Sequence, residues 1–200
     1  MSKPANPELA RKILDIALTE LSAKAPEEIN MRDIAEGAGV SSTAIYYYFA
    51  SKDALFERIK FDAMDELDSR LSASTRSVAG PNERLAAFIR AYAAWCLERP
   101  HLAKLLLEDL PPKEPLDDEA MRKYYASFFR ARDIVEEAIA AGSLGDRDAL
   151  LDVSIAQAAI WGIVSQFRSK RVHPRFWNSI DPLIERFIQI YLGDQGGDRR

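Results

Sequence analysis

Residues 30–49, NMRDIAEGAGVSSTAIYYYF, gather hydroxyl and phenol groups of the kind that contact nucleic acids. The stretch from Gly37 to Lys52 holds no acidic residue, and Glu36 and Asp53 mark its two limits. Hydroxyl and phenol groups can donate hydrogen bonds to phosphate oxygens and to base edges. Because no carboxylate lies among them, these side chains could approach a phosphate backbone without repulsion.

A short helix, a tight turn and a second short helix would position these side chains, which is the layout of a helix-turn-helix. Asn30 can cap the first helix, and Asp33, three residues on, can reach back in the manner of a capping box. Gly39 can take the left-handed conformation that reverses the chain, and Ser41 can cap the second helix. The segment therefore predicts two short helices joined at Gly39.

The second short helix is expected to point small, polar and aromatic side chains outward, namely Ser42, Thr43, Ala44, Tyr46 and Tyr47. Such a helix fits the major groove of DNA, where each base pair presents a distinct pattern of donors and acceptors. The amino end of the helix adds a partial positive charge. Lys52, in the first turn of the next helix, can make the one formal ion contact. Since the net charge of the chain is -4, DNA binding must be local.

The remainder of the 200 residues also reads as helical, because apolar residues recur at helical spacing and no run alternates as a half-buried strand would. The pattern predicts an all-α fold of about nine helices. The expected domains are a helix-turn-helix DNA-binding domain over residues 1–50 and a larger effector-binding and dimerisation domain over residues 51–193. Residues 194–200 are expected to form a disordered tail.

The stretch from about residue 10 to residue 60, and above all MRDIAEGAGVSSTAIYYYFASKDALF, resembles the tetracycline-repressor (TetR) type of bacterial transcription regulators. The resemblance implies an amino-terminal three-helix DNA-binding domain and a long fourth helix as connector. It also implies a helical ligand-binding domain and a homodimer formed by the last two long helices.

Carried over by position, the resemblance implies a role in DNA binding for nine residues. Arg32 would contact DNA from the second helix, and Tyr46 would pack at a base or sugar edge. The others would face bases, reach phosphates or begin a helix at the DNA: Ser41, Ser42, Thr43, Ala44, Tyr47, Tyr48 and Lys52. Many relatives carry Lys-Gly or a similar pair where this chain has Ser42-Thr43. The resemblance therefore predicts that binding here depends less on salt, by about 0.9 logarithmic units per lost phosphate contact.

The second domain holds more aromatic residues than one small core layer needs, and ligand pockets are largely apolar with a few polar groups. A pocket for a small hydrophobic or aromatic effector is therefore expected to be lined by Phe88, Tyr92, Trp95, Tyr124, Tyr125, Phe128, Gln157 and Trp161. For any single one of these residues, an ordinary place in the core competes evenly with this interpretation. Gln157 could instead form a hydrogen bond across a dimer interface.

Residues 153–167 hold no charged side chain, and apolar or small residues point in every direction around the helix axis. A helix that is apolar all round needs cover on all sides. The rest of the chain can cover one side, so the other side is expected to meet a second copy. The predicted interface comprises Ile155, Ala159, Gly162, Ile163, Ile184, Phe187, Ile188 and Tyr191.

The sequence speaks against an enzyme, because carboxylate pairs, histidine clusters or a cysteine with a suitable base do not appear at useful spacing. Cys96 fits a buried small hydrophobe, and His101 and His173 suggest no metal site. No cofactor is expected. The single cysteine and the lack of an apolar signal segment or of about 18 uncharged apolar residues in a row predict a cytoplasmic protein.

The sequence therefore predicts a homodimeric, ligand-responsive regulator, most simply a repressor, that binds a palindromic operator in double-stranded DNA and is released by a small-molecule effector. One alternative is a regulator that responds to no small molecule. The others are a helical enzyme with an aromatic pocket and an interaction module whose helix-turn-helix binds protein.

Overall fold

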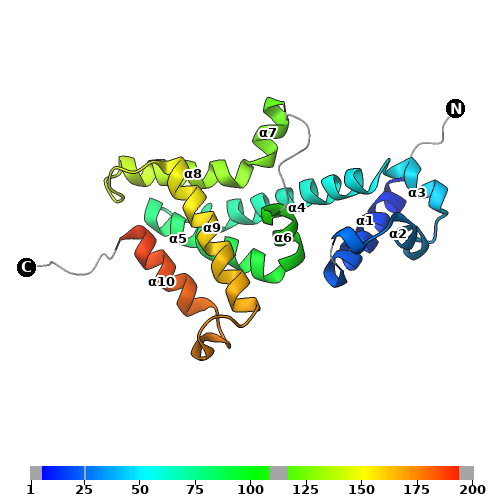
Figure 1. Ribbon diagram of the computed structural model, residues 1–200. Coiled ribbons are helices and arrows are strands. Elements are labelled where there is room, and N and C mark those ends of the chain that lie inside the picture. Colours follow the sequence, from blue (N-terminus) through cyan, green and yellow to red (C-terminus); the bar gives the residue numbers. More distant parts are fainter. Residues whose placement is uncertain (1–5, 25, 109–116, 194–200) are drawn as a thin grey trace, which may run out of the picture. The chain divides into compact units, whose positions relative to one another are not determined.

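The computed structural model describes residues 6–24, 26–108 and 117–193, and over these residues it contains helices and no strand. The predicted all-α fold is confirmed. The α-helices, labelled in Figure 1, are α1 (Pro7–Ala23), α2 (Met31–Ala38), α3 (Ser42–Tyr48), α4 (Lys52–Thr75), α5 (Pro81–Glu98), α6 (Pro100–Glu108), α7 (Asp118–Tyr124), α8 (Ala126–Ala140), α9 (Ala149–Arg168) and α10 (Asp181–Leu192). Two single 3₁₀ turns are η1 (Pro26–Glu28) and η2 (Pro174–Phe176). The predicted tail, residues 194–200, lies outside the described residues.

The described part of the chain contains ten α-helices, whereas the sequence predicts about nine. The difference arises because α7 and α8 occupy a stretch that the sequence predicts as one helix. Tyr125 separates them with φ -105° and ψ 19°, outside the ordinary helical region. The apolar spacing continues through this break, so periodicity alone did not reveal it.

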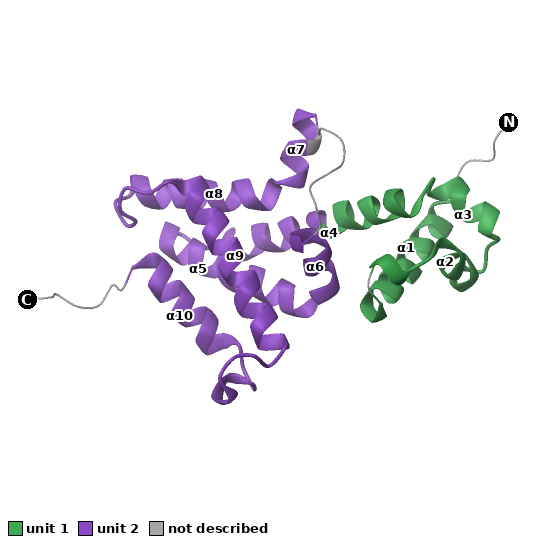
Figure 2. Ribbon diagram, in the orientation of Figure 1, with its two compact units in different colours: residues 1–63 green, residues 64–200 purple. Residues whose placement is uncertain are grey.

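Two compact units divide the chain, Met1–Ala63 and Met64–Arg200, drawn in green and purple in Figure 2. The division falls within α4, whereas the sequence-based limit at residue 50 lies just before that helix. The first turns of α4 therefore count with the amino-terminal unit. The assignment of DNA binding to one unit and of effector binding to the other stays a prediction.

The amino-terminal unit is built from helices whose starts are fixed by side-chain caps. The Asn6 side chain accepts a hydrogen bond from the Glu8 N–H, and Pro7 occupies the first turn of α1. α1 buries one stripe, Ile13, Ala17 and Leu21, against α2. Each of these three side chains is at most 3% exposed. This packing gives α2 and α3 a fixed base.

The carboxy-terminal unit packs α5 at its centre, against α6, α8, α9 and α10. Charged pairs tie α4 to this group: Arg130 on α8 donates two hydrogen bonds of 2.9 Å to Asp68, and Arg70 pairs with Glu98 on α5. The buried surface of α5 is unusually wide, because Trp95 and its neighbours are covered from several directions. A helix so placed can line a cavity in the middle of the unit.

Among the described helices, α9 is the one long and apolar enough to cross a membrane, judged by length and composition only. Core helices share that composition, and α9 packs against α5, α8 and α10 through Val153, Ala156, Ile160 and Val164. Its opposite face remains uncovered in a single chain.

Candidate functional site

The turn between α2 and α3 has the geometry that a helix-turn-helix requires. Gly39 ends α2 in the left-handed conformation, with φ 74° and ψ 31°, and the next N–H, that of Val40, donates to the Ala35 carbonyl at 2.9 Å. Ala35 is 1% exposed, and its small side chain lets α2 and its neighbours approach closely. The predicted reversal at Gly39 is confirmed.

Side-chain caps set the start of both short helices. The Asn30 Oδ1 accepts from the Asp33 N–H at 2.9 Å, and the Ser41 Oγ accepts from the Ala44 N–H at 3.1 Å. Asp33 does reach back toward Asn30, but its carboxylate accepts from the side-chain amide at 2.7 Å rather than from the backbone. The start of α2 is thus fixed by the side chains of Asn30 and Asp33 together, in a variant of the capping box.

A second glycine, Gly37, allows α1 and α2 to pack closely, and the sequence pattern did not reveal this role. A Cβ on Gly37 would lie 2.9 Å from a methyl group of Ile16 on α1. The contact needs a residue without a side chain at that position. The small residues in the EGAG run therefore serve helix packing as well as the turn.

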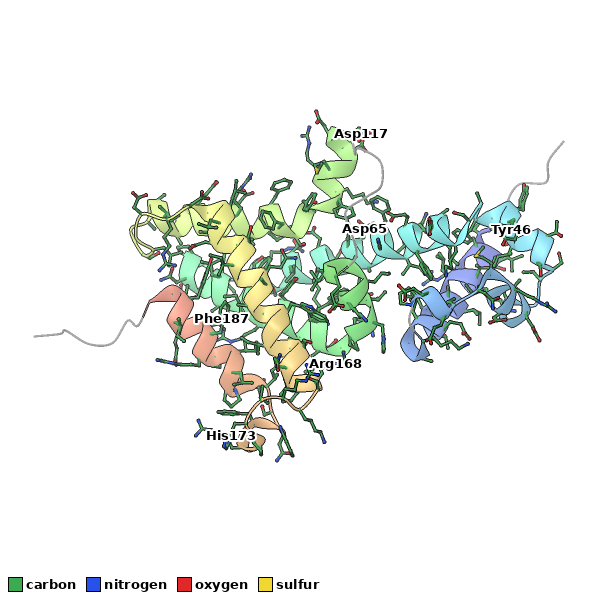
Figure 3. The ribbon with its side chains drawn as sticks, viewed as in Figure 1. Tyr46, Asp65, Asp117, Arg168, His173 and Phe187 are labelled. Carbon is green, nitrogen blue, oxygen red and sulfur yellow. The ribbon has the colours of Figure 1, made fainter. Side chains whose placement is uncertain are left out.

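The outward face of α3 carries the polar and aromatic groups that the sequence placed there. Ser42 and Thr43 are exposed, and Tyr46 and Tyr47 are 51% and 54% exposed; Tyr46 is labelled in Figure 3. Ile45 points the other way and is fully buried. Large exposed aromatic rings on a helix anchored by a buried residue are suited to contact a ligand surface.

The other residues expected at DNA divide into two groups. Arg32 on α2 is exposed, so it can contribute to the same surface. Ala44 and Tyr48 are half-buried, and the Tyr48 hydroxyl accepts from the Asn6 N–H at 3.4 Å while its ring meets Tyr47 edge-on. Ser41 is exposed, with its hydroxyl oxygen used as the cap of α3.

Lys52 does not point outward as the sequence predicted. Its ammonium group donates to the carbonyls of Ile29 at 2.9 Å and of Pro26 at 3.0 Å, and it lies 5.8 Å from the centre of the Phe56 ring. Both carbonyls lie in the segment before α2, and the cation in the first turn of α4 binds them together. The structure therefore gives Lys52 an internal role, and its expected contact with the DNA backbone stays a prediction.

A cavity of about 120 Å³ lies inside the carboxy-terminal unit. Its walls come from α4 to α10, and the residues that line it within the described chain are uncharged: Met64, Leu67, Leu85, Phe88, Ile89, Tyr92, Leu106, Tyr124, Tyr125, Ser127, Phe128, Ala131, Val135, Val153, Ala156, Gln157, Ile160 and Tyr191. Such a site can enclose an apolar molecule and offer it a few hydroxyl and amide groups.

Six of the eight predicted pocket residues line this cavity, namely Phe88, Tyr92, Tyr124, Tyr125, Phe128 and Gln157. Trp95 and Trp161 do not. Trp95 is 1% exposed and its indole N–H donates to Glu66 at 3.2 Å, so it belongs to the core. Trp161 is half-buried on α9, beside the lining residues Gln157 and Ile160 but outside the cavity wall.

Sequence reasoning missed the aliphatic part of the cavity wall and its contribution from α10. Leu67 and Tyr191 lie more than 100 residues apart, and only the packing of the unit brings them to one cavity. Burial raises the pKa of the Tyr191 phenol to about 12, with Asp152 adding to the effect. A local sequence signal for such a pair does not exist.

Burial also sets the protonation of two groups on α5 near the cavity. It raises the pKa of the Tyr92 phenol well above its ordinary range, and that of the Cys96 thiol to about 12. Cys96 is 0% exposed. The thiol therefore stays protonated at neutral pH, as expected of a small buried hydrophobe rather than a nucleophile.

Comparison with known proteins first concerns the amino-terminal unit. Residues 13–59 match the model of a family described as bacterial regulatory proteins, tetR family. The matched range contains the whole α2–turn–α3 arrangement and the first turns of α4. Residues 13–59 therefore carry the amino-terminal domain of the TetR family.

Other proteins are similar to this chain over nearly its whole length. The HTH-type transcriptional repressor KstR2 of Mycolicibacterium smegmatis is 27% identical, over 95% of this chain and 92% of that protein. A protein of unknown function from Rhodococcus sp. RHA1 has the same fold, with a TM-score of 0.80, 22% identity and coverage of 96% and 97%. FadR of Bacillus subtilis, solved in complex with stearoyl-CoA, gives a TM-score of 0.72 at 19% identity, over 93% of this chain and 99% of FadR.

The helix pair expected at the dimer interface, α9 and α10, exposes part of the predicted set. Ile155 on α9 is 57% exposed, and Ala159, Gly162, Ile163, Phe187 and Tyr191 are half-buried; Phe187 is labelled on α10 in Figure 3. Ile184 and Ile188 are 4% and 5% exposed. These two residues fill the core beneath α10, so their predicted place in an interface is wrong.

Two apolar residues that sequence reasoning did not assign to the interface are more exposed than most of those it did. Leu151 on α9 is 58% exposed, and Ile190 on α10 is 63% exposed. Ile190 lies two residues after Ile188, on another side of the helix, and the choice between them needs the packing of α10 on α5.

Metal binding gains no support from the geometry. Over the described residues, histidine, cysteine, aspartate and glutamate side chains do not gather in groups of three or more that could hold an ion. Asp118 and Glu119 lie in the first turn of α7, where acids favour the helix start. The His173 Nδ1 accepts from the Arg175 N–H and caps η2.

Proposed function

We propose that this TetR-family regulator is a cytoplasmic repressor that binds a palindromic operator as a homodimer and is released by a small hydrophobic or aromatic effector. The observation that carries the proposal is the exposed face of α3. Ser42, Thr43, Tyr46 and Tyr47 stand on one short helix whose buried anchor, Ile45, holds it against α2. The relative from Mycolicibacterium smegmatis is named a transcriptional repressor, which supports the sign of regulation.

The hydroxyl and phenol groups of α3 would read DNA by contacts to base edges and phosphates. The nearest acids on the flanking helices are Glu36 and Asp53, so the α3 face itself brings no negative charge to the phosphates. With Lys52 engaged inside the unit, Arg32 is the cation best placed to supply an ionic contact. Binding would then rest on hydrogen bonds and ring contacts more than on ion pairs.

The dimer would form through the uncovered faces of α9 and α10. Leu151, Ile155 and Ile190 expose more than half of their side-chain surface. Contiguous exposed apolar residues are typical of association surfaces. A two-fold dimer would present two copies of α3 about 34–36 Å apart, one turn of DNA, which matches a palindromic site.

The effector would occupy the cavity of the carboxy-terminal unit, whose uncharged and largely apolar wall suits a hydrophobic ligand. FadR, a structural neighbour, holds stearoyl-CoA, which supports an apolar ligand in this fold. The ligand would favour a conformation in which α4 is displaced and the spacing of the two α3 helices changes. It can do so only by its difference in affinity between the two conformations.

Fluorescence anisotropy with labelled DNA from the region upstream of the gene tests the DNA-binding step. We expect the wild-type protein to bind at low salt and Tyr47→Ala to lose at least tenfold in affinity. Trp177→Ala is the matched control, since Trp177 is 43% exposed in the other unit. Equal binding by Tyr47→Ala and Trp177→Ala, with both proteins folded, would refute the assigned surface.

A further inference from the structure

The hydroxyl of Tyr92 is buried at the wall of the cavity without a hydrogen-bond partner. Tyr92 is 5% exposed, and its phenol oxygen is one of two such side-chain atoms in the described chain. Its ring stacks on Phe88, with 6.4 Å between ring centres, so the side chain is held in place from one side. A buried hydroxyl that forms no hydrogen bond is unfavourable for stability. A ligand oxygen in the cavity could supply the missing hydrogen bond.

Gln157 on α9 supplies a second polar group at the same cavity. Both residues line the same cavity of about 120 Å³, so a ligand enclosed there lies near both side chains. Its amide can donate and accept, whereas the phenol of Tyr92 donates one hydrogen bond and can accept another. Together they can hold one oxygen atom of a ligand, either a hydroxyl or a carbonyl.

The charge of the cavity wall limits what that oxygen can be. The described lining residues include no lysine, arginine or histidine, and no acid. Burial of a carboxylate away from water without a paired cation is strongly unfavourable. The oxygen that reaches Tyr92 should therefore belong to an uncharged group.

The size of the cavity limits the apolar part of the ligand. At about 120 Å³ it is close to an engineered cavity of about 150 Å³ that binds benzene. Aromatic side chains form much of the wall, among them Tyr125 and Phe128, whose ring centres lie 6.5 Å apart. One six-membered ring fills such a space, and edge-to-face contacts with the wall favour an aromatic ring.

We infer that the cavity takes an uncharged, ring-sized apolar group that carries one oxygen, and that the Tyr92 hydroxyl and the Gln157 amide bind this oxygen. The inference rests on the proposed function, in which this cavity holds the effector. Two sources share the chemistry: a free phenol or ketone, and the ring of a larger conjugate whose charged part lies outside the cavity.

Isothermal titration calorimetry with p-cresol, toluene and p-toluate tests the inference, because the three probes differ only in the group on the ring. We expect p-cresol to bind more tightly than toluene, and p-toluate to bind at least tenfold more weakly than p-cresol. Equal affinity for toluene and p-cresol, binding of p-toluate at the affinity of p-cresol, or no binding of any probe would overturn the inference.

Tyr92→Phe separates a ligand-binding hydroxyl from a structural one. We expect it to weaken p-cresol binding about 3- to 10-fold, to leave toluene binding unchanged, and to raise the melting temperature of the ligand-free protein. Tyr46→Phe, which removes an exposed hydroxyl of the other unit, is the matched control and should change neither quantity. A Tyr92→Phe protein of lower melting temperature that binds p-cresol like the wild type would show that the hydroxyl is structural, against the inference.

The source of the ring and the effector role are tested by two further measurements. The coenzyme A thioester of p-toluic acid should bind more tightly than p-cresol if the natural ligand is a conjugate, and more weakly if it is a free compound; either result agrees with the inference if Tyr92→Phe weakens binding of the tighter probe. If p-cresol binds as expected but leaves the DNA complex intact, the cavity assignment stands and the proposed control by an effector fails.

Discussion

Substitution of Lys52 by methionine tests whether this residue stabilises the fold or contacts DNA. The methionine side chain keeps most of the apolar stem over Phe56 and removes the ammonium group, together with its bonds to the carbonyls of Pro26 and Ile29. The third carbonyl, that of Glu27, lies at 3.5 Å and contributes little. Two internal hydrogen bonds are therefore lost.

The size of the effect follows from these two bonds. Hydrogen bonds to a charged group contribute about 1.5–3 kcal/mol each, and the lower value applies because Lys52 is half-buried. The methionine side chain is not held by such bonds, and the conformational entropy that it keeps, about 1.5 kcal/mol, offsets part of the loss. We expect the free energy of unfolding of the amino-terminal unit to fall by about 1.5–2 kcal/mol, which lowers the urea midpoint by roughly 1–2 M.

Urea unfolding followed by circular dichroism measures this change, with Lys12→Met as the control of equal charge, since Lys12 is exposed on α1. The salt dependence of DNA binding tests the alternative, in which Lys52 contacts a phosphate. If Lys52→Met unfolds like the wild type but reduces the slope of log affinity against log salt by about 0.9, Lys52 is a phosphate contact and our assignment is refuted.

Three further predictions concern the turn, the interface and an ion pair. Gly39→Ala forces a side chain into φ 74° and should lower the free energy of unfolding by about 1–2 kcal/mol; an unchanged urea midpoint would contradict the role of the turn. Ile155→Asp should convert a dimer into monomers in analytical ultracentrifugation, whereas Met121→Asp, at a 39% exposed position on α7, should not. Arg90 holds the pKa of the Glu185 carboxyl below its ordinary value, so the ion pair stabilises the fold above the unfolded-state pKa and is lost as the pH falls through the folded-state pKa. The stability difference between the wild type and Glu185→Gln should thus be present at pH 7, begin to decline near the unfolded-state pKa of about 4.3, and vanish below the lower folded-state pKa; a difference that persists in strong acid would count against this account.

The amino-terminal unit was largely predictable because local residues decide its geometry. Asn30, Gly39 and Ser41 each act within three or four positions along the chain, and each does in the structure what its type and spacing indicate. Exposure of Tyr46 and Tyr47 follows from the same helical spacing once Ile45 is placed inside.

Features that depend on distant parts of the chain could not be predicted in this way. Lys52 was expected to be free at the surface, but its partners lie 23 and 26 residues earlier in the sequence. Ile188 and Ile190 are equally apolar, and which of them is buried depends on how α10 lies on α5. Trp95 is an aromatic residue on α5 like the lining residues Phe88 and Tyr92, but its side chain donates to Glu66 and does not line the cavity.

Because of the interruption at Tyr125, a ligand bound in the proposed cavity would touch the joint between α7 and α8. Tyr124, the last residue of α7, and Tyr125, at the joint itself, both line the cavity. Arg130, a little over one turn along α8, forms a bidentate ion pair with Asp68 on α4. A molecule that pushes the joint outward would therefore pull on a carboxylate fixed to α4. α4 is a single uninterrupted helix from Lys52 to Thr75. We therefore expect a ligand the size of one ring to displace the end of α4 that follows α3.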